Sequence, residues 1–247
     1  MNWKKIKAAI VRNGELKPVK ELEITSLKSL FGMSAQKKLL KENTKNFLAN
    51  KAANHALLWG EMGCGKSSLV RAVFCKYMEK NLRLIEMPKS ELNSLYSVLC
   101  EVRKARKFKF IIFCDDFSFE GVNTDVSELK RLLEGSIEKT PSNALFYATS
   151  NRRHLLKDEK NDENFLIQKE NQRDNLSLAD RFGLQISFYE LDFKEYLALC
   201  TELFNSQNWE PSRQTKLENL ARSFVSEKGI KSPRTARQLY AIYGDKI

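Results

Sequence analysis

The sequence predicts an α/β fold: a five-stranded parallel sheet flanked by helices, followed by a small domain of three helices. Two observations predict it. Between residues 56 and 189, short apolar strands alternate with stretches of helical spacing, which is typical of parallel βαβ units. From Asp192 onward, the apolar residues recur only at helical spacing. We therefore expect an N-terminal extension at residues 1–25, an α/β domain at 26–190 and a helical domain at 191–247.

The expected α/β part opens with a helix for which Ser34 is the N-cap. Strands are expected at residues 56–59, 82–87, 108–114, 144–149 and 184–189. The third strand is a nearly unbroken apolar run, which predicts the centre of the sheet, because a central parallel strand is buried on both faces. Helices are expected after each of the first three strands and, as a short one, at 176–182. Residues 157–174 are charged and rich in Asn, which predicts an exposed, mobile loop.

The expected helical part begins with a capping box made by Asp192 and Glu195. A second helix ends near Gly229. A third begins at Ser232-Pro233, with serine as N-cap and proline at the first helical position. We expect these helices to form a small bundle.

Composition limits the class of protein. Hydrophobic residues make up 42% of the chain, yet no run approaches the ~18 apolar residues of a membrane span, and no apolar signal stretch opens the sequence. We therefore expect a cytoplasmic protein with no membrane partner. Five widely spaced cysteines indicate reduced thiols, and with two histidines and no paired cysteine spacing a structural zinc site is not expected.

The net charge is +11, and this excess requires solvated faces or anionic partners. Nucleic acid is one such partner. However, basic residues are spread along the whole chain, and no long Lys/Arg run marks a dedicated binding arm. Charge alone leaves a nucleic-acid partner and a protein partner equally open.

One stretch fits the phosphate-binding pattern of Gly, four residues and Gly-Lys-Ser, namely Gly60-Glu61-Met62-Gly63-Cys64-Gly65-Lys66-Ser67. It joins a strand to a helix, where backbone N–H groups and the positive end of the helix hold an anionic phosphate. Lys66 is expected to reach the outer phosphates of ATP, and the Ser67 hydroxyl to be a ligand of the accompanying Mg²⁺. We assign nucleotide binding to Gly60, Gly63, Cys64, Gly65, Lys66, Ser67 and Ser68.

Acidic residues follow the central strand. Asp115 stands where P-loop NTPases place the carboxylate that helps hold Mg²⁺, and a strand-end Asp that caps a turn is the alternative. Asp116 stands where many ATPases carry a Glu that polarises the attacking water, and its shorter side chain leaves that role open. Glu120 is a second candidate for the role, against the simpler interpretation of a solvated loop residue.

Five segments occur in a characteristic order: Gly60 to Ser67, Phe110 to Asp116, Ala148 to Asn151, Ala179 to Gly183, and Ser232 to Arg234. In this order they resemble an AAA+ ATPase from about Leu27 to the C-terminus. Residues 115–120, 133–135, 148–155 and 178–184 closely resemble a bacterial family of ATP-binding AAA+ proteins with a domain of unknown function. The resemblance implies a fold and a nucleotide site but no cellular task.

By this resemblance, Lys66 and Ser67 are Walker A residues, and Asp115 and Asp116 are Walker B residues. Asn151 is the sensor 1 residue, a polar group between the Walker B strand and the phosphate. The Asp-Asp pair departs from the commoner Asp-Glu, which leaves the rate of hydrolysis open.

The resemblance also implies two catalytic arginines and an adenine pocket. Arg181 resembles the arginine finger that acts on the nucleotide of a neighbouring subunit, which implies a homo-oligomer; a surface pair with Asp180 is the alternative. Arg234 resembles sensor 2. It stands in the first turn of a helix, where the dipole disfavours a cation unless an anion is bound, although a solvated surface Arg is the alternative. Residues 30–33, with Phe31 and Gly32, match the segment that lines the adenine pocket.

Three function classes follow. The first is an oligomeric Mg²⁺-ATPase that remodels or loads a protein or nucleic-acid partner. The second, suggested by Asp116, is an ATP-dependent binding switch with slow or absent turnover. The third is a P-loop small-molecule kinase, which is the weakest because the expected loop at 157–174 is acidic as well as basic and has no Gly-rich hinge.

Overall fold

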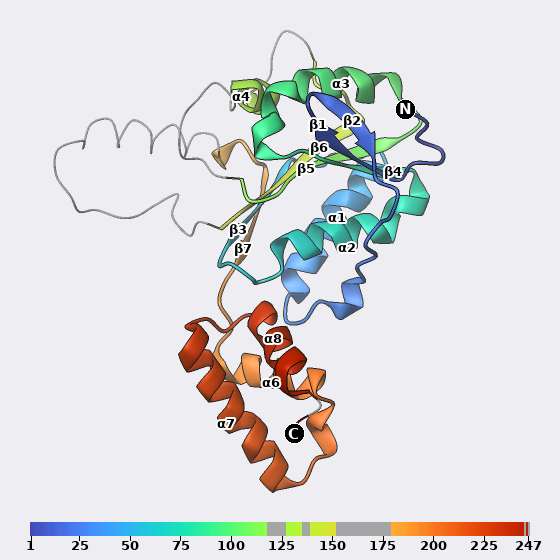
Figure 1. Ribbon diagram of the computed structural model, residues 1–247. Helices are drawn as coiled ribbons and strands as arrows, with labels where there is room; N and C mark the ends of the chain where they lie inside the picture. The colour runs from blue at the N-terminus through green and yellow to red at the C-terminus, as the bar shows by residue number, and fades with distance from the viewer. Residues whose placement is uncertain (118–126, 135–138, 152–178, 245, 247) are drawn as a thin grey trace, which may run out of the picture.

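The computed structural model describes residues 1–117, 127–134, 139–151, 179–244 and 246 (Figure 1). Within these residues, seven strands form one sheet in the order β2-β1-β4-β5-β6-β3-β7. The strands are β1 (Ala8–Arg12), β2 (Glu15–Pro18), β3 (Ala56–Gly60), β4 (Leu82–Glu86), β5 (Lys109–Cys114), β6 (Ala144–Ser150) and β7 (Leu184–Phe188). Every neighbouring pair is parallel except β1 and β2. The predicted parallel α/β fold is confirmed, and β3 to β7 are its five expected strands.

The two additional strands come from residues 1–25, for which an N-terminal extension of uncertain structure was expected. β1 pairs with β4, so this segment is part of the sheet. The hairpin turn is Asn13-Gly14, with φ angles of 51° and 74°, as in the type I′ turn that Asn-Gly favours. The Glu91 carboxylate accepts hydrogen bonds from both backbone N–H groups of this turn, at 2.7 and 2.9 Å. Asn13-Gly14 is a local hairpin signal, but charged residues surround the short apolar run Ala8–Val11 and obscure its strand pattern.

Helices cover both faces of the sheet, with α1 and α2 on one face and α3 and α4 on the other (Figure 1). The helices are α1 (Ser34–Leu48), α2 (Lys66–Tyr77), α3 (Leu95–Lys104) and α4 (Ser127–Glu134). Successive residues of β5 point to opposite faces, so Phe110 and Ile112 lie in one core cluster and Ile111 and Phe113 in the other. β5 is therefore buried on both faces, as predicted for the central strand.

The C-terminal helices lie beyond the carboxyl ends of the strands and pack on an apolar core of their own (Figure 1). They are α6 (Phe193–Leu203), α7 (Pro211–Lys228) and α8 (Pro233–Tyr243). Both capping predictions are confirmed: Asp192 and Glu195 form a capping box, and Ser232 caps α8. Ser34 is instead the first residue of α1, after Met33. We call α6 to α8 the lid.

Short 3₁₀ helices complete the described elements: η1 (Leu27–Ser29), η2 (Met78–Lys80), η3 (Lys89–Ser94) and η5 (Ser206–Asn208). No helix in the described part of the chain combines the length and apolar character needed to cross a membrane. Several predictions lie outside the described residues, namely Glu120, the loop at 157–174, and most of the short helix at 176–182. The helix expected after β5 is described only as α4.

Candidate functional site

A cleft of about 640 Å³ opens between the carboxyl edge of the sheet and α8. The phosphate loop follows β3, Asp115 follows β5 and Asn151 follows β6. Carboxyl ends of parallel strands meet at one edge of a sheet, so these distant residues converge there. The cleft is lined by Leu30, Phe31, Met33, Met62, Gly63, Gly65, Lys66, Ser67, Ser68, Arg71, Asp115, Asp116, Thr149, Asn151, Pro233, Arg234, Arg237, Gln238 and Ala241.

Two glycines shape the phosphate loop. Gly63 and Gly65 have φ angles of 80° and 92°, in the left-handed region that residues with a Cβ rarely adopt. A Cβ at Gly65 would lie 2.7 Å from Met33 Cε, and one at Gly63 would lie 2.9 Å from Ser232 Oγ. The loop therefore packs closely against both the segment before α1 and the lid, and a Cβ at either position would meet the side chain of Met33 or of Ser232.

The first glycine of the motif has a structural role. Gly60 does not line the cleft, and a Cβ there would lie 1.9 Å from the carbonyl oxygen of Phe188 in β7. Cys64 also lies outside the lining; its buried Sγ donates to the Tyr189 carbonyl at 3.3 Å. Burial raises the pKa of the Cys64 thiol, so it stays protonated at neutral pH. Both residues attach the phosphate loop to β7 and to the chain that leaves it.

Lys66 is only 5% exposed, and its Nζ donates to the backbone carbonyls of Gly60 and Glu61, each at 2.8 Å. Burial lowers the pKa of the Lys66 ammonium, while nearby acidic groups act in the opposite direction. Because a buried cation is costly without compensating charge, a bound anion would stabilise it.

The Asp115 carboxylate is held from three directions. Ser67 Oγ and Thr149 Oγ1 each donate to its Oδ1 at 2.5 Å, and an Arg71 guanidinium nitrogen lies 3.7 Å from its Oδ2. Thr149 Oγ1 also accepts from the backbone N–H of Asp116 at 2.9 Å. The two residues expected to bind Mg²⁺, Ser67 and Asp115, are thus in direct contact.

Asp116 and Asn151, expected to be catalytic, also contact each other. Asn151 Nδ2 donates to Asp116 Oδ1 at 2.5 Å. Asp116 has a φ of 52°, a left-handed conformation that costs a residue with a Cβ roughly 1–2 kcal/mol. The hydrogen bonds with Asn151 and Thr149 therefore hold Asp116 in this left-handed conformation, and its carboxylate lines the cleft.

The lid contributes two arginines to the cleft. Arg234 lines it from the first turn of α8, and Arg237 follows one turn later. Arg237 also donates to the Ser29 carbonyl at 3.1 Å, which ties α8 to the segment before α1.

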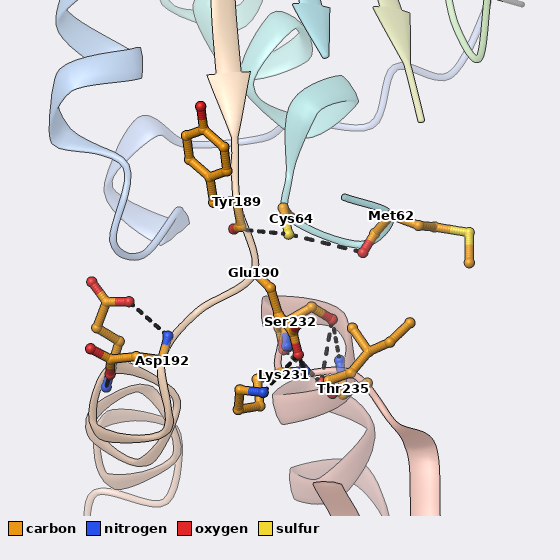
Figure 2. A network of polar contacts seen from close by, with 10 residues as sticks. Met62, Cys64, Tyr189, Glu190, Asp192, Lys231, Ser232 and Thr235 are labelled. Carbon is orange, nitrogen blue, oxygen red and sulfur yellow. Dashed lines mark hydrogen bonds and ion pairs between the residues drawn. The ribbon is translucent and has the colours of Figure 1, made fainter. Parts of the chain in front are cut away.

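Figure 2 shows where the phosphate loop, the chain leaving β7 and the start of α8 meet. Glu190 Oε1 accepts from both the backbone N–H and the Nζ of Lys231, at 2.7 and 2.9 Å. The Leu191 N–H donates to the Lys231 carbonyl at 3.1 Å. Together with the Cys64 contact to Tyr189, these bonds form a continuous path from phosphate loop to lid.

The structure gathers most of the expected site residues in one cleft. Those that line it are Phe31, Gly63, Gly65, Lys66, Ser67, Ser68, Asp115, Asp116, Asn151 and Arg234. Gly32, Gly60, Cys64 and Arg181 do not line it. Arg181 is exposed in the turn before β7.

Sequence reasoning missed four polar residues of the cleft, one of which is Gln238 on α8. Thr149 ends β6 beside Asp115, Arg71 stands four residues after Ser67 on α2, and Arg237 stands three residues after Arg234 on α8. For the two arginines, helical spacing from an assigned residue was an available signal.

The donor set fits a magnesium nucleotide. A hydroxyl and a carboxylate in contact offer the oxygen ligands that Mg²⁺ prefers, with phosphate oxygens and waters to complete its shell. Among the described residues, no cluster of three or more His, Cys, Asp and Glu side chains could hold a metal by itself. Ser67 and Asp115 are the residues that would hold Mg²⁺ in this cleft.

The fold is that of the AAA+ P-loop NTPases, as comparison with solved structures shows. Similar solved structures include C. elegans PCH-2, with a TM-score of 0.58 and 13% identity over 89% of this chain and 65% of that one. Thermotoga maritima RuvB is also similar. One single-residue variant of it has a TM-score of 0.50 and 14% identity, covering 88% of this chain and 71% of that one, and a second variant has a TM-score of 0.52. This chain spans less than two thirds of PCH-2, and at such identities the likeness shows the fold.

The chain belongs to the family described as protein of unknown function DUF815, whose model matches residues 2–246. Comparison with curated protein sequences found no significant match.

Proposed function

We propose that this protein binds Mg²⁺-ATP in the cleft and hydrolyses it as a homo-oligomer that acts on a macromolecular partner. One observation carries the proposal: Lys66, Ser67 and Asp115 converge in a single cleft that is also lined by two arginines of the lid. The buried Lys66 ammonium supplies charge for the outer phosphates, and Ser67 and Asp115 supply oxygens for Mg²⁺. We also propose that residues 191–247, which contain the lid, form a distinct domain.

The rest of the nucleotide fits the other wall of the cleft. Apolar surface lines it from two segments: Leu30, Phe31 and Met33 before α1, and Pro233 and Ala241 of α8. A purine ring has two apolar faces and a polar edge, so a slot between these segments suits adenine.

Hydrolysis requires a group that orients water and groups that neutralise charge. Asp116 is our candidate for the first task, with its carboxylate positioned by Asn151. Arg234 is the candidate within the same chain for the second task, and it would contact the phosphates when the lid closes.

Arg181 suggests that the complete site is shared between subunits. It is exposed, outside its own cleft, and precedes the β7 edge of the sheet. A guanidinium supplied by a neighbour neutralises charge on the transferred phosphoryl group, which is worth about 10³–10⁵ in rate where such fingers are characterised. ATP affinity depends on it far less.

Steady-state ATP turnover measured against protein concentration tests the proposal. Turnover per chain should rise as subunits associate. Arg181→Ala should lose turnover but keep ATP affinity within a few-fold, and Arg222→Ala, a matched change on the exposed side of α7, should behave as wild type. Mixing the Arg181→Ala and Lys66→Ala proteins should restore activity. In a mixed oligomer, an Arg181→Ala subunit keeps Lys66 and can receive Arg181 from a neighbouring Lys66→Ala subunit. Full activity of Arg181→Ala at concentrations where the wild type is monomeric would refute the shared site.

An ATP-dependent binding switch is the second candidate, and the short Asp116 side chain favours it. Asp116 Oδ1 is already engaged by Asn151, at 2.5 Å. Under this alternative, Asp116→Asn would hydrolyse bound ATP no more slowly than the wild type in a single-turnover measurement. A large loss of rate in that variant supports the ATPase.

A further inference from the structure

A second concave surface lies at the opposite edge of the sheet from the nucleotide cleft. It has a volume of about 650 Å³, and we call it the basic groove. Asn81 precedes β4, Lys109 begins β5 and Asn143 precedes β6, so the groove follows the amino ends of the strands. β5 has six residues, which places the groove about 20 Å from Asp115. The lining residues are Leu48, Asn50, Lys80, Asn81, Arg103, Arg106, Lys107, Lys109, Lys139, Thr140, Pro141, Ser142 and Asn143.

The groove concentrates positive charge. Its cations are Lys80, Arg103, Arg106, Lys107, Lys109 and Lys139, and none of the described residues that line it is acidic. The whole chain has 42 Lys and Arg against 31 Asp and Glu, so an average surface with six bases would carry about four acids. A concave surface lined only by positive charges produces a field that attracts polyanions.

The fold holds the walls of the groove in place. Asn143 Nδ2 donates to the carbonyls of Val102 and Phe108, at 2.9 and 3.2 Å, which fixes the loop between α3 and β5 against the start of β6. Arg103 bridges the same gap by donating to the Lys139 carbonyl at 2.9 Å. The loop that carries the exposed Arg106 and Lys107 is thus anchored at both ends.

Lys109 shows that the groove suits an anion. Its Nζ donates to the Ser142 carbonyl at 3.2 Å and lies 4.8 Å from the centre of the Phe47 ring. Burial lowers the pKa of this ammonium, and no ion pair between described residues involves it. A bound anion would offset that cost of burial.

The side chains of the groove favour one kind of polyanion. Lys, Arg, Asn, Ser and Thr are the residues that contact phosphate and sugar in complexes with nucleic acids. No described large exposed hydrophobic residue lines the groove, so it offers nothing to insert into a lipid bilayer. Among its described lining residues there is also no aromatic ring on which unpaired bases would stack. What remains is recognition of a duplex through its backbone.

We propose that the basic groove binds the phosphodiester backbone of a double-stranded nucleic acid without reading its sequence. This proposal names the class of the macromolecular partner and in that respect rests on the proposed function, but binding to the groove itself requires no ATP.

Two elements connect the basic groove to the nucleotide cleft. α2 begins at Lys66 and leads into η2, which carries Lys80, and β5 runs from Lys109 to the residue before Asp115.

Fluorescence anisotropy with a labelled duplex of about 30 base pairs tests the groove, in the absence of nucleotide and over a salt series. The test variant is the double substitution Arg106→Gln and Lys107→Gln, both at exposed positions. The matched control, Lys194→Gln and Lys216→Gln, removes the same charge from exposed positions on the lid.

Each lost backbone contact should make the slope of log K against log salt about 0.9 shallower, so the groove variant should lose up to about 2 in slope. Its affinity should fall at least about tenfold at low salt, and the control should stay within about twofold. Equal losses in the two variants would overturn the proposal, because net charge alone would then explain binding.

The partner class is tested with DNA and RNA duplexes and with vesicles of anionic phosphatidylglycerol. The proposal is supported if either duplex binds and the groove variant weakens that binding. The duplex that binds then shows whether the partner is DNA or RNA. Failure of the wild type to bind either one near ~0.15 M salt overturns it, as does groove-dependent binding of vesicles alone. ATP calorimetry on the same preparations separates the two proposals. If the wild type binds the duplex but does not bind ATP, the proposed ATPase activity is contradicted and the proposal for the basic groove still stands.

Discussion

Thr149→Val is predicted to weaken both the fold and the metal site, because the Thr149 hydroxyl joins the two acidic residues after β5. It is 1% exposed, donates to Asp115 Oδ1 at 2.5 Å and accepts from the Asp116 N–H at 2.9 Å. A hydrogen bond to a charged group contributes about 1.5–3 kcal/mol and one between neutral groups about 0.5–1.5. Valine has nearly the same shape and leaves no cavity, so the free energy of unfolding should fall by the sum of the two, about 2–4.5 kcal/mol.

Urea denaturation of the nucleotide-free protein measures this loss, with Thr149→Ser as the control that keeps the hydroxyl. Serine loses one methyl group, which costs only about 1 kcal/mol. Calorimetry should also show that valine reduces ATP affinity with Mg²⁺ present and leaves it nearly unchanged in EDTA. If the valine and serine variants have equal stability and bind Mg²⁺-ATP like the wild type, Thr149 does not hold Asp115 in place.

Three further predictions concern other parts of the chain. Gly60→Ala should destabilise the nucleotide-free protein by about 3 kcal/mol or more in urea, because its Cβ would overlap the Phe188 carbonyl; wild-type stability would contradict this. Arg234→Ala should lower ATP affinity in calorimetry and leave the free energy of unfolding unchanged or about 0.3–1 kcal/mol higher, because it removes a cation from the first turn of α8. The His55 ring accepts a hydrogen bond from the Phe146 N–H, and burial lowers its pKa to about 4 in the folded protein. In the unfolded chain the pKa of His55 is about 6.5, so between these two pH values the unfolded chain binds more protons than the folded one. Stability should therefore fall by up to about 3 kcal/mol as pH decreases from about 6.5 to about 4, and His55→Asn, which keeps an acceptor, should reduce that dependence.

Local patterns predicted the centre of the molecule well. The phosphate motif, the apolar run of β5 and the caps of α6 and α8 are each encoded within a few adjacent residues. Such signals place elements at the same edge of a parallel sheet, so Lys66 and Asp115 could be expected to converge from the sequence alone.

Contacts between distant segments could not be predicted in the same way. The role of Gly60 depends on the close approach of β7, and that of Thr149 on the alignment of β6 with β5. The basic groove is formed by Lys80, residues 103–109 and Lys139, which are brought together only by folding. The hairpin at the sheet edge did have a local signal, Asn13-Gly14, which was outweighed by its charged surroundings.

Calorimetric titration of ATP in the presence of Mg²⁺ tests the central claim, that the cleft is an ATP site built on Lys66. The wild type should bind ATP in the cleft. Lys66→Ala should weaken that binding by about 10- to 100-fold, the equivalent of about 1.5–3 kcal/mol for a charge-assisted contact. Lys76→Ala, which removes an exposed lysine from the same helix, should bind like the wild type. Unchanged ATP affinity in a folded Lys66→Ala protein would contradict the account.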